Sequence, residues 1–175
     1  KFWGVRGSIP TPGSETAKYG GNTICIEMIF ADVQRRIIID AGSGLRLLGD
    51  HLLAEQDAIK AFKSDIFLTH THLDHIIGFP FFAPIFNPRT RLKVYGPVTC
   101  ETESLKTVIG GQLSYRYFPV RQQELAAQID YINLAEGCFD LGDDIRLTTK
   151  YLNHPLLCLG LRFEYNVKVC FSAYD

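Results

Sequence analysis

The stretch His70-Thr71-His72-Leu73-Asp74-His75 places three imidazoles and a carboxylate within six residues, directly after the apolar run Ile66-Phe67-Leu68-Thr69. Alternate side chains of an extended chain share a face, so a strand end can direct the first, third and fifth of these residues at one point. A helical turn beginning there can bring the sixth back toward the same point. Imidazole and carboxylate ligands suit zinc, manganese or iron, and no thiol for a structural zinc site lies nearby. A lone His is usually a core or surface residue, whereas this cluster predicts an open metal site of the catalytic type.

Composition predicts one folded domain, spanning residues 1–175. The chain is 46% hydrophobic and 21% charged, values typical of a globular protein, and its formal net charge of −1 offers no general attraction for nucleic acid or an acidic membrane. It contains no apolar run long enough to span a membrane and no leader-like N-terminus. The five Cys are odd in number and form no CxxC pair, so we expect no disulfide framework and a cytoplasmic location.

Hydrophobic periodicity and turn residues predict strands that alternate with helices. The expected strands are Phe2–Arg6, Thr23–Phe30, Arg36–Asp40, Ile66–Thr69, Arg91–Tyr95, Ile145–Leu152, Leu157–Tyr165 and Lys168–Ser172. The expected helices are Leu45–Ile59, Asp74–Phe82 and Thr99–Val108, whereas residues 110–137 give no clear pattern. Hairpins mixed with strand-helix-strand units indicate an α/β layered domain with mixed sheets, and the metal-binding residues fall at strand ends.

The histidine-rich stretch resembles the HxHxDH signature of the metallo-β-lactamase superfamily. Four further segments resemble the branch that contains ribonuclease Z-like and cyclic-phosphodiester hydrolases: Trp3–Pro10, Tyr19–Thr23, Ile39–Gly44 and Gly78–Phe82. The resemblance runs over the whole chain. The signature is specific for the superfamily, and the other segments indicate the branch without fixing the substrate.

This resemblance implies a four-layered αβ/βα sandwich with two divalent metal ions, zinc before manganese or iron, in a cleft at its edge. By position, His70, His72 and His154 would bind the first metal, Asp74 and His75 the second, and Asp175 would bridge both. Asp40 would accept the remaining ring N–H of a ligand histidine and so orient it, because metal-bound histidines usually have such a partner. The alternative role for Asp40 is that of a helix N-cap.

The family completes its second metal site with another His beyond the bridging Asp, whereas this sequence stops at Asp175. We therefore expect the C-terminal part of the family fold to be missing. A gap should lie beside Asp74 and His75, bordered by an exposed apolar face near the strand Lys168–Ser172. His51, in a leucine-patterned helix, is expected to be a surface residue rather than the missing ligand.

The implied activity is hydrolysis of a phosphodiester by a metal-activated hydroxide at a dinuclear centre, with Asp74 also acting as the catalytic residue that orients the nucleophile. A small or cyclic phosphodiester suits the near-neutral charge better than a long RNA does. Two alternatives stay open: hydrolysis of another ester, a lactone or an amide, and a di-iron site for redox chemistry or oxygen sensing. The sequence predicts no membrane partner and does not determine the oligomeric state.

Overall fold

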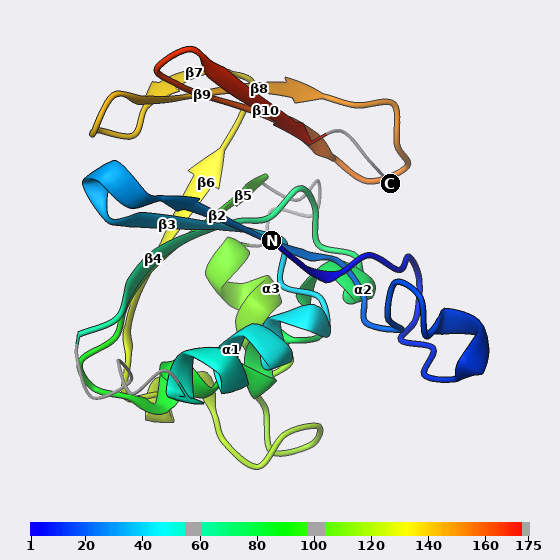
Figure 1. Cartoon of the computed structure of the whole chain (residues 1–175). Helices are drawn as coiled ribbons and strands as arrows, with labels where there is room; N and C mark the ends of the chain where they lie inside the picture. The colour runs from blue at the N-terminus through cyan, green and yellow to red at the C-terminus, as the bar shows by residue number, and fades with distance from the viewer. Residues whose placement is uncertain (55–60, 98–103, 173–175) are drawn as a thin grey trace.

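The structure, a computed structural model, describes residues 1–54, 61–97 and 104–172. Its strands form two sheets stacked face to face (Figure 1). The larger sheet has the order β1 (Phe2–Gly4), β2 (Cys25–Phe30), β3 (Arg35–Ile39), β4 (Lys63–Phe67), β5 (Arg91–Pro97) and β6 (Gln128–Leu134). The smaller sheet has the order β10 (Lys168–Ser172), β9 (Leu159–Tyr165), β8 (Ile145–Tyr151) and β7 (Gly137–Asp140).

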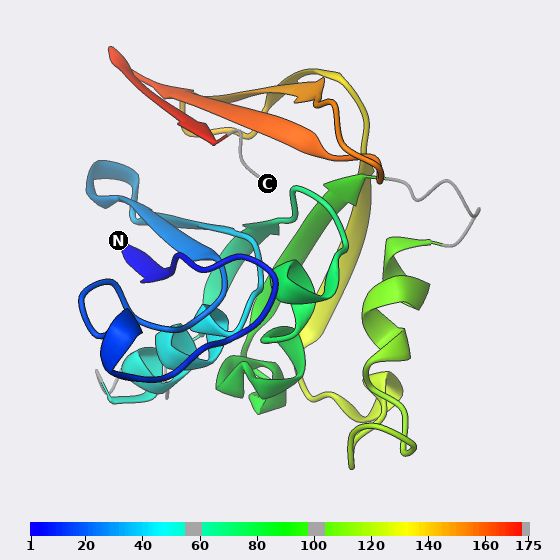
Figure 2. The ribbon, with the colours of Figure 1, turned by 90° about the vertical axis from the view of Figure 1, so that its right-hand side faces the viewer.

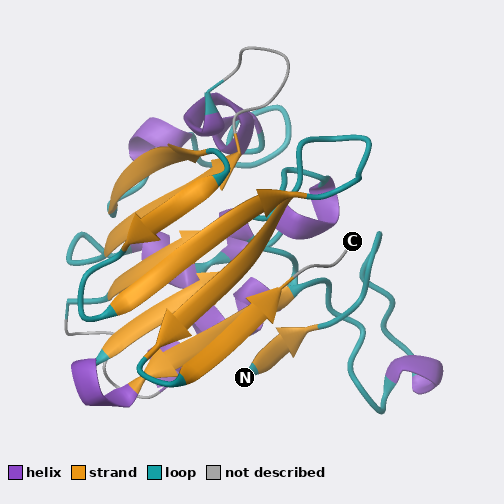
Figure 3. Ribbon diagram, turned by 90° about the horizontal axis from the view of Figure 1, so that it is seen from above, coloured by secondary structure: helices purple, strands orange, loops and turns teal. Residues whose placement is uncertain are grey.

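The six-stranded sheet is mixed. Its first three strands pair antiparallel and β3 to β6 pair parallel. Helices α1 (Gly44–Ala54) and α3 (Leu105–Gly111) lie on one side of it, and the four-stranded sheet lies on the other (Figure 1). Figure 2 shows β6 leading from the larger sheet up to the smaller one, and Figure 3 shows the smaller sheet laid over the larger.

Two hydrophobic cores fill the spaces between these layers. Consecutive residues of β3 divide between them, because side chains alternate across a strand: Ile38 packs on the helix side, and Ile37 and Ile39 pack between the sheets. In β4 the same division places Ile66 on the helix side and Phe67 between the sheets. The central strands therefore favour consecutive apolar residues, such as Ile37-Ile38-Ile39 in β3 and Ile66-Phe67 in β4.

The four-stranded sheet is antiparallel and buries one face. In β8, Ile145 and Leu147 are buried while Arg146 between them is exposed. The edge strand β10 exposes Val169 and Phe171, which are 54% and 63% accessible. Two exposed apolar side chains thus lie on the strand near which the sequence predicted an apolar face.

The α/β architecture predicted from the sequence is confirmed. Three layers of the sandwich, helices, mixed sheet and antiparallel sheet, are seen in order, and no helix within the described ranges lies on the outer face of the smaller sheet (Figure 1). None of the described helices combines the length and the apolar character needed to cross a lipid bilayer.

The helix predicted over residues 74–82 is wrong in its extent. One helical turn and two 3₁₀ turns replace it: α2 (Leu73–Ile76), η4 (Phe79–Phe81) and η5 (Ala83–Phe86). Gly78 lies so close to the backbone of Gly42 that a Cβ there would meet the Gly42 carbonyl oxygen at 2.0 Å. Pro80 and Pro84 follow, and neither has an N–H to continue a helical hydrogen-bond ladder. Tertiary contact and proline together end the helix early.

Other element ends also differ from the prediction. Strand β4 starts at Lys63, three residues early, because buried Asp65 pairs with Arg35 and so can enter the sheet. Helix α3 (Leu105–Gly111) follows Ser104, whose side chain accepts the Thr107 N–H at 3.1 Å, and the predicted start at Thr99 lies outside the described residues. Strand β6 lies within residues 110–137, which gave no clear pattern, and strand β7, which starts at the end of that stretch, was not predicted. The predicted end of the first helix at Ile59 lies outside the described residues.

Candidate metal centre

Asp40 and Thr69 meet because they follow neighbouring parallel strands. Strands β3 and β4 pair with Ile39 opposite Phe67, so their carboxyl ends reach the same edge of the sheet, where α/β proteins commonly place their sites. Asp40 adopts the left-handed backbone conformation, with φ 58°, which turns the chain out of the sheet. Its buried carboxylate accepts the Thr69 backbone N–H at 2.8 Å.

Helix α2 packs against the backbone of Ala41 and Gly42. Ala41 N–H donates to the His75 carbonyl at 2.7 Å, and Gly78 N–H donates back to the Ala41 carbonyl at 2.8 Å. A Cβ on Gly42 would lie 2.4 Å from the Asp74 carbonyl oxygen, so only glycine permits this approach. The glycine turn therefore positions Asp74 and His75 beside the strand end.

Three imidazoles converge at this edge of the sheet. His70, His72 and His154 each offer a ligand atom, and these atoms all lie within 4.8 Å of one another. His70 Nε2 faces His72 Nδ1 at 3.0 Å, and the His154 ring lies 4.6 and 4.8 Å from the rings of His70 and His72. His70 is buried, His154 half-buried and His72 exposed, so the cluster opens to solvent on one side.

His75 and Asp74 form a second group beside these rings. The His75 ring centroid lies 4.1 Å from that of His70. His75 Nδ1 contacts Asp40 Oδ2 at 2.9 Å, and because an ionised carboxylate only accepts, this nitrogen carries the proton. His75 Nε2, on the other side of the ring, lies 3.5 Å from Asp74 Oδ2, which also accepts the Ser8 backbone N–H at 2.7 Å.

His154 reaches the cluster from the other sheet, on the connection between β8 and β9. The connection is fixed at its base, where Leu152 N–H donates to the Cys158 carbonyl at 2.9 Å. Leu159 N–H then donates to the Thr69 carbonyl at 2.8 Å, which joins β9 directly to the histidine-bearing loop. Within the connection, His154 Nδ1 lies 2.9 Å from the Leu156 carbonyl oxygen and 3.1 Å from the Leu156 backbone N–H, so this ring nitrogen is held by the backbone of its own loop.

The donor set fits a divalent metal ion. Zn–N bonds of about 2.0–2.1 Å place tetrahedral ligand nitrogens roughly 3.3 Å apart, close to the spacing of the His70 and His72 nitrogens. His75 has the carboxylate partner that metal-bound histidines usually have. The thiol of Cys25 is not part of this set. Burial raises the pKa of the Cys25 thiol well above its ordinary value, and the negative charges of Asp40 and Glu27 raise it further, so Cys25 stays a neutral core residue.

The structure brings together most of the residues that the sequence predicted for the site: Asp40, His70, His72, Asp74, His75 and His154. Asp175, the predicted bridging ligand, lies outside the described residues. His51 is not in the cluster. It packs half-buried against Trp3, with 5.0 Å between ring centroids, rather than lying fully on the surface.

Two contributors were not singled out from the sequence. Ser8 supplies a backbone N–H to Asp74, and its φ of 66° is a strained value that no local pattern predicts. Thr69 directly precedes the first histidine, and its hydroxyl contacts Asp40, His70 and His75. Its place next to the signature was the only available signal.

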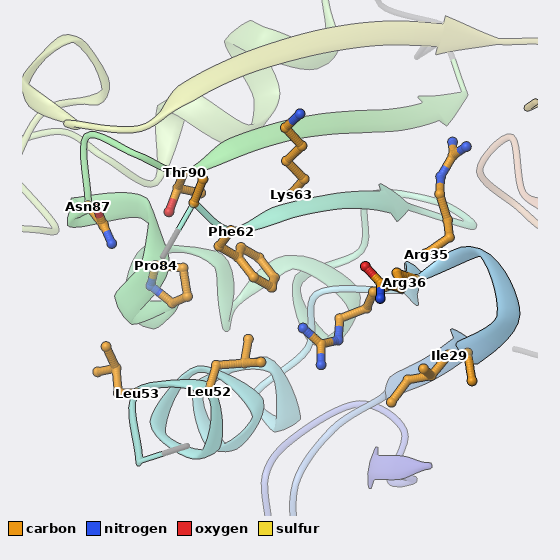
Figure 4. Close-up of a pocket in the computed structure, with 13 residues that line it drawn as sticks. Ile29, Arg35, Arg36, Leu52, Leu53, Phe62, Lys63, Pro84, Asn87 and Thr90 are labelled. Atoms are coloured by element: carbon orange, nitrogen blue, oxygen red, sulfur yellow. The ribbon is translucent and has the colours of Figure 1, made fainter. Parts of the chain in front are cut away.

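A cavity of about 640 Å³ lies elsewhere, around the start of β4 and the C-terminal half of α1 (Figure 4). Its arginines are already paired, Arg36 with Glu27 at 2.6 Å and Arg35 with Asp143 at 2.8 Å. In Figure 4 the side chains of Arg35 and Lys63 point away from Phe62. We therefore place the candidate site at the histidine cluster and not in this cavity.

Comparison with known families gives a match over residues 19–122, more than half of the chain, to the family model described as the metallo-beta-lactamase superfamily. Among curated proteins, a "Ribonuclease Z" of Clostridium novyi is 29% identical over 98% of the chain and a "Ribonuclease BN" of Cronobacter sakazakii is 31% identical over 73%. The chain spans about half or less of the length of these relatives, 52% and 38% respectively.

Solved structures show the same fold. The short form of human tRNase Z superposes with a TM-score of 0.65 and 18% identity, covering 99% of this chain and 68% of the other. The metallo-beta-lactamase fold protein YhfI from Bacillus subtilis superposes with a TM-score of 0.61 and 17% identity, covering 97% of this chain and 59% of the other.

Proposed function

The chain belongs to the metallo-beta-lactamase superfamily, and from that premise we propose that it is a metal-dependent hydrolase whose substrate is a phosphodiester. The observation that carries the proposal is the convergence of His70, His72 and His154 from two different sheets. Two imidazole nitrogens that face each other at 3.0 Å, as those of His70 and His72 do, are unfavourable unless a proton or a cation lies between their lone pairs. A bound divalent ion would meet this requirement for all three rings.

In this proposal the three converging histidines hold one divalent ion, and Asp74 and His75 hold a second, with Asp175 as the bridging ligand. A bound divalent ion would make water more acidic and would polarise the phosphoryl group. Other residues of the protein hold these side chains in fixed orientations. Asp40 holds the His75 ring through Nδ1–H, and the Ser8 N–H holds one Asp74 oxygen. A carboxylate fixed in this way can accept a hydrogen bond from the attacking water and so orient it.

The substrate class is supported by the names of the relatives. Both curated relatives are called ribonucleases, and an RNA linkage is a phosphodiester. The formal net charge of −1 gives this chain little general attraction for a long polyanion, so a small phosphodiester or a short RNA is the substrate we propose.

The test is a substrate panel assayed with zinc, manganese or iron. A chromogenic phosphodiester and a short RNA should be hydrolysed faster than a β-lactam or a lactone. Equal or reversed rates would refute the phosphodiesterase assignment. Metal analysis of protein purified without added metal checks the cofactor separately, because a redox-active di-iron protein without hydrolytic activity would contradict the hydrolase reading altogether.

A further inference from the structure

The side-chain hydroxyl of Thr69 lies at the centre of the buried part of the site, and the function proposed above gives it no role. Its oxygen is 3.1 and 3.0 Å from the two oxygens of Asp40. It is 3.1 Å from His70 Nδ1 and 3.3 Å from His75 Nδ1. Thr69 is 1% exposed, so water cannot take the place of these partners. The hydrogen bonds of this hydroxyl therefore have to be satisfied within the group.

Proton counting decides the direction of each bond. A hydroxyl has one hydrogen to donate and can accept two, whereas an ionised carboxylate only accepts. If the Thr69 hydrogen pointed away from Asp40, oxygen lone pairs would face one another in a buried place, which is costly. The hydrogen therefore goes to Asp40, and the Thr69 oxygen acts as an acceptor toward the histidines.

The acceptor capacity of Thr69 is used by His70. His75 Nδ1–H has a closer acceptor in Asp40 Oδ2, at 2.9 Å, than in the hydroxyl. His70 Nδ1 has Thr69 at 3.1 Å and, besides it, the Cys158 sulfur at 3.8 Å, which is a weak acceptor. The hydroxyl thus receives the His70 Nδ1–H.

We propose that Thr69 is a positioning residue that fixes the tautomer of His70. With the proton on Nδ1, the lone pair is on Nε2, the nitrogen that faces His72 Nδ1 at 3.0 Å. One carboxylate then orients two histidines, His75 by direct contact and His70 through the Thr69 hydroxyl. The proposal rests on the metal-holding part of the proposed function and is independent of which substrate is hydrolysed.

The tautomer can be read directly by nitrogen-15 NMR of the imidazole rings in the metal-free protein. We expect wild-type His70 to carry its proton on Nδ1. Thr69→Val, which keeps the shape and removes the hydroxyl, should shift His70 toward the Nε2–H form. Thr69→Ser, which keeps the hydroxyl, should retain the wild-type form. Thr71→Val is the matched control, because Thr71 lies on the same loop and makes none of these contacts.

Zinc affinity gives a second readout, measured by competition with a chelator. Loss of a hydrogen-bond partner behind a metal ligand typically weakens affinity about 10- to 100-fold. We expect that loss for Thr69→Val and wild-type affinity for Thr69→Ser and Thr71→Val. Circular dichroism confirms that each variant is folded.

An Nε2–H tautomer of His70 in the wild-type protein would overturn the proposal without any variant. So would a folded Thr69→Val with the wild-type tautomer and affinity. Should Thr69→Val not fold, the spectra of wild type and Thr69→Ser decide, because both must show the Nδ1–H form. A protein that passes these tests and hydrolyses no phosphodiester would contradict the proposed function only.

Discussion

The six-stranded sheet is buried on both faces, whereas the four-stranded sheet is buried on one, and the candidate site draws on them unequally. Asp40, His70, Asp74 and His75 all follow β3 or β4 of the larger sheet. The smaller sheet supplies His154, from a connection between two of its strands. A strand fixed from above and below can hold several side chains in one geometry, and a single docked loop can then complete the group.

Breaking the contact between the sheets should have the largest effect on stability. Phe67 stacks on Tyr95 with 4.4 Å between centroids and meets Phe163 of the smaller sheet edge-on at 5.2 Å. Phe67→Ala should lower the free energy of unfolding by about 3–5 kcal/mol, because it leaves a cavity between the layers. Phe171→Ala, on the exposed edge strand, should change it by no more than about 0.5 kcal/mol. Urea unfolding of both variants tests this contrast, which fails if their losses are similar.

Removing one imidazole should disable the site without unfolding either sheet. His72→Ala should lower metal content, and reduce any metal-dependent activity by more than about 100-fold, since even a partner behind a ligand can cost that much. His51→Ala is the control, a histidine outside the cluster. Metal stoichiometry by elemental analysis is the measurement. Full stoichiometry in His72→Ala would show that the cluster is not the metal site.

The polar contacts that Arg35 makes between the sheets should contribute less to stability than the aromatic contacts of Phe67. Arg35 of β3 reaches Asp65 through Nε at 3.2 Å, and its Nη1 donates to the Leu141 carbonyl and to Asp143 at 2.9 and 2.8 Å. Arg35→Lys keeps the charge and loses the forked geometry, so we expect a loss of about 1–2 kcal/mol. Arg146→Lys on the exposed face of β8 should be neutral within roughly 0.5 kcal/mol. Equal effects in thermal melts would show that Arg35 does not join the sheets.

Alkaline pH should lower the free energy of unfolding by a small amount, through a tyrosine on the helix side of the larger sheet. Burial raises the pKa of Tyr131 in β6 to about 12, although a hydrogen bond from Gln122 partly opposes the shift. A raised folded pKa favours the protonated state, so its stabilisation is complete below about pH 10 and is lost as pH rises toward 12. Between pH 8 and 11 the wild type should lose roughly 1 kcal/mol that Tyr131→Phe does not lose.

The control for this pH effect is Tyr117→Phe, at a tyrosine that is 75% exposed. It should follow the wild-type curve. A Tyr131→Phe protein with the same alkaline loss as wild type would remove Tyr131 as the cause.

The sequence predicted those features of the fold that depend on a few consecutive residues. The runs Ile37-Ile38-Ile39 and Ile66-Phe67-Leu68 predict strands that are buried on both faces, because consecutive apolar residues point to opposite faces of a sheet. Strand β6 was missed because Gln128 and Asp130 alternate with half-buried residues along the outermost strand of its sheet, a pattern that exposed loops share. Helix α2 ends early because Gly78 contacts the backbone of Gly42. The order of residues in the sequence does not reveal this contact.

The site shows the same division. The histidine-rich stretch was recognised by its chemistry, and His154 through the family resemblance. Asp40 was also singled out because a carboxylate that closes an apolar strand needs a buried partner. Thr69 was not, because threonine is ordinary at a strand end and its importance comes from the three side chains packed around its hydroxyl.

His70 and His154 lie 84 positions apart in the chain, and this separation also bears on the kinetics of folding. Contacts so distant in sequence form after the local ones, because a long loop has to close first. A cation held between these histidines would thus bind only when both sheets are already docked. Interactions absent from the folding transition state leave the folding rate nearly unchanged and slow unfolding. Metal binding would therefore slow the unfolding of the folded protein without speeding its folding.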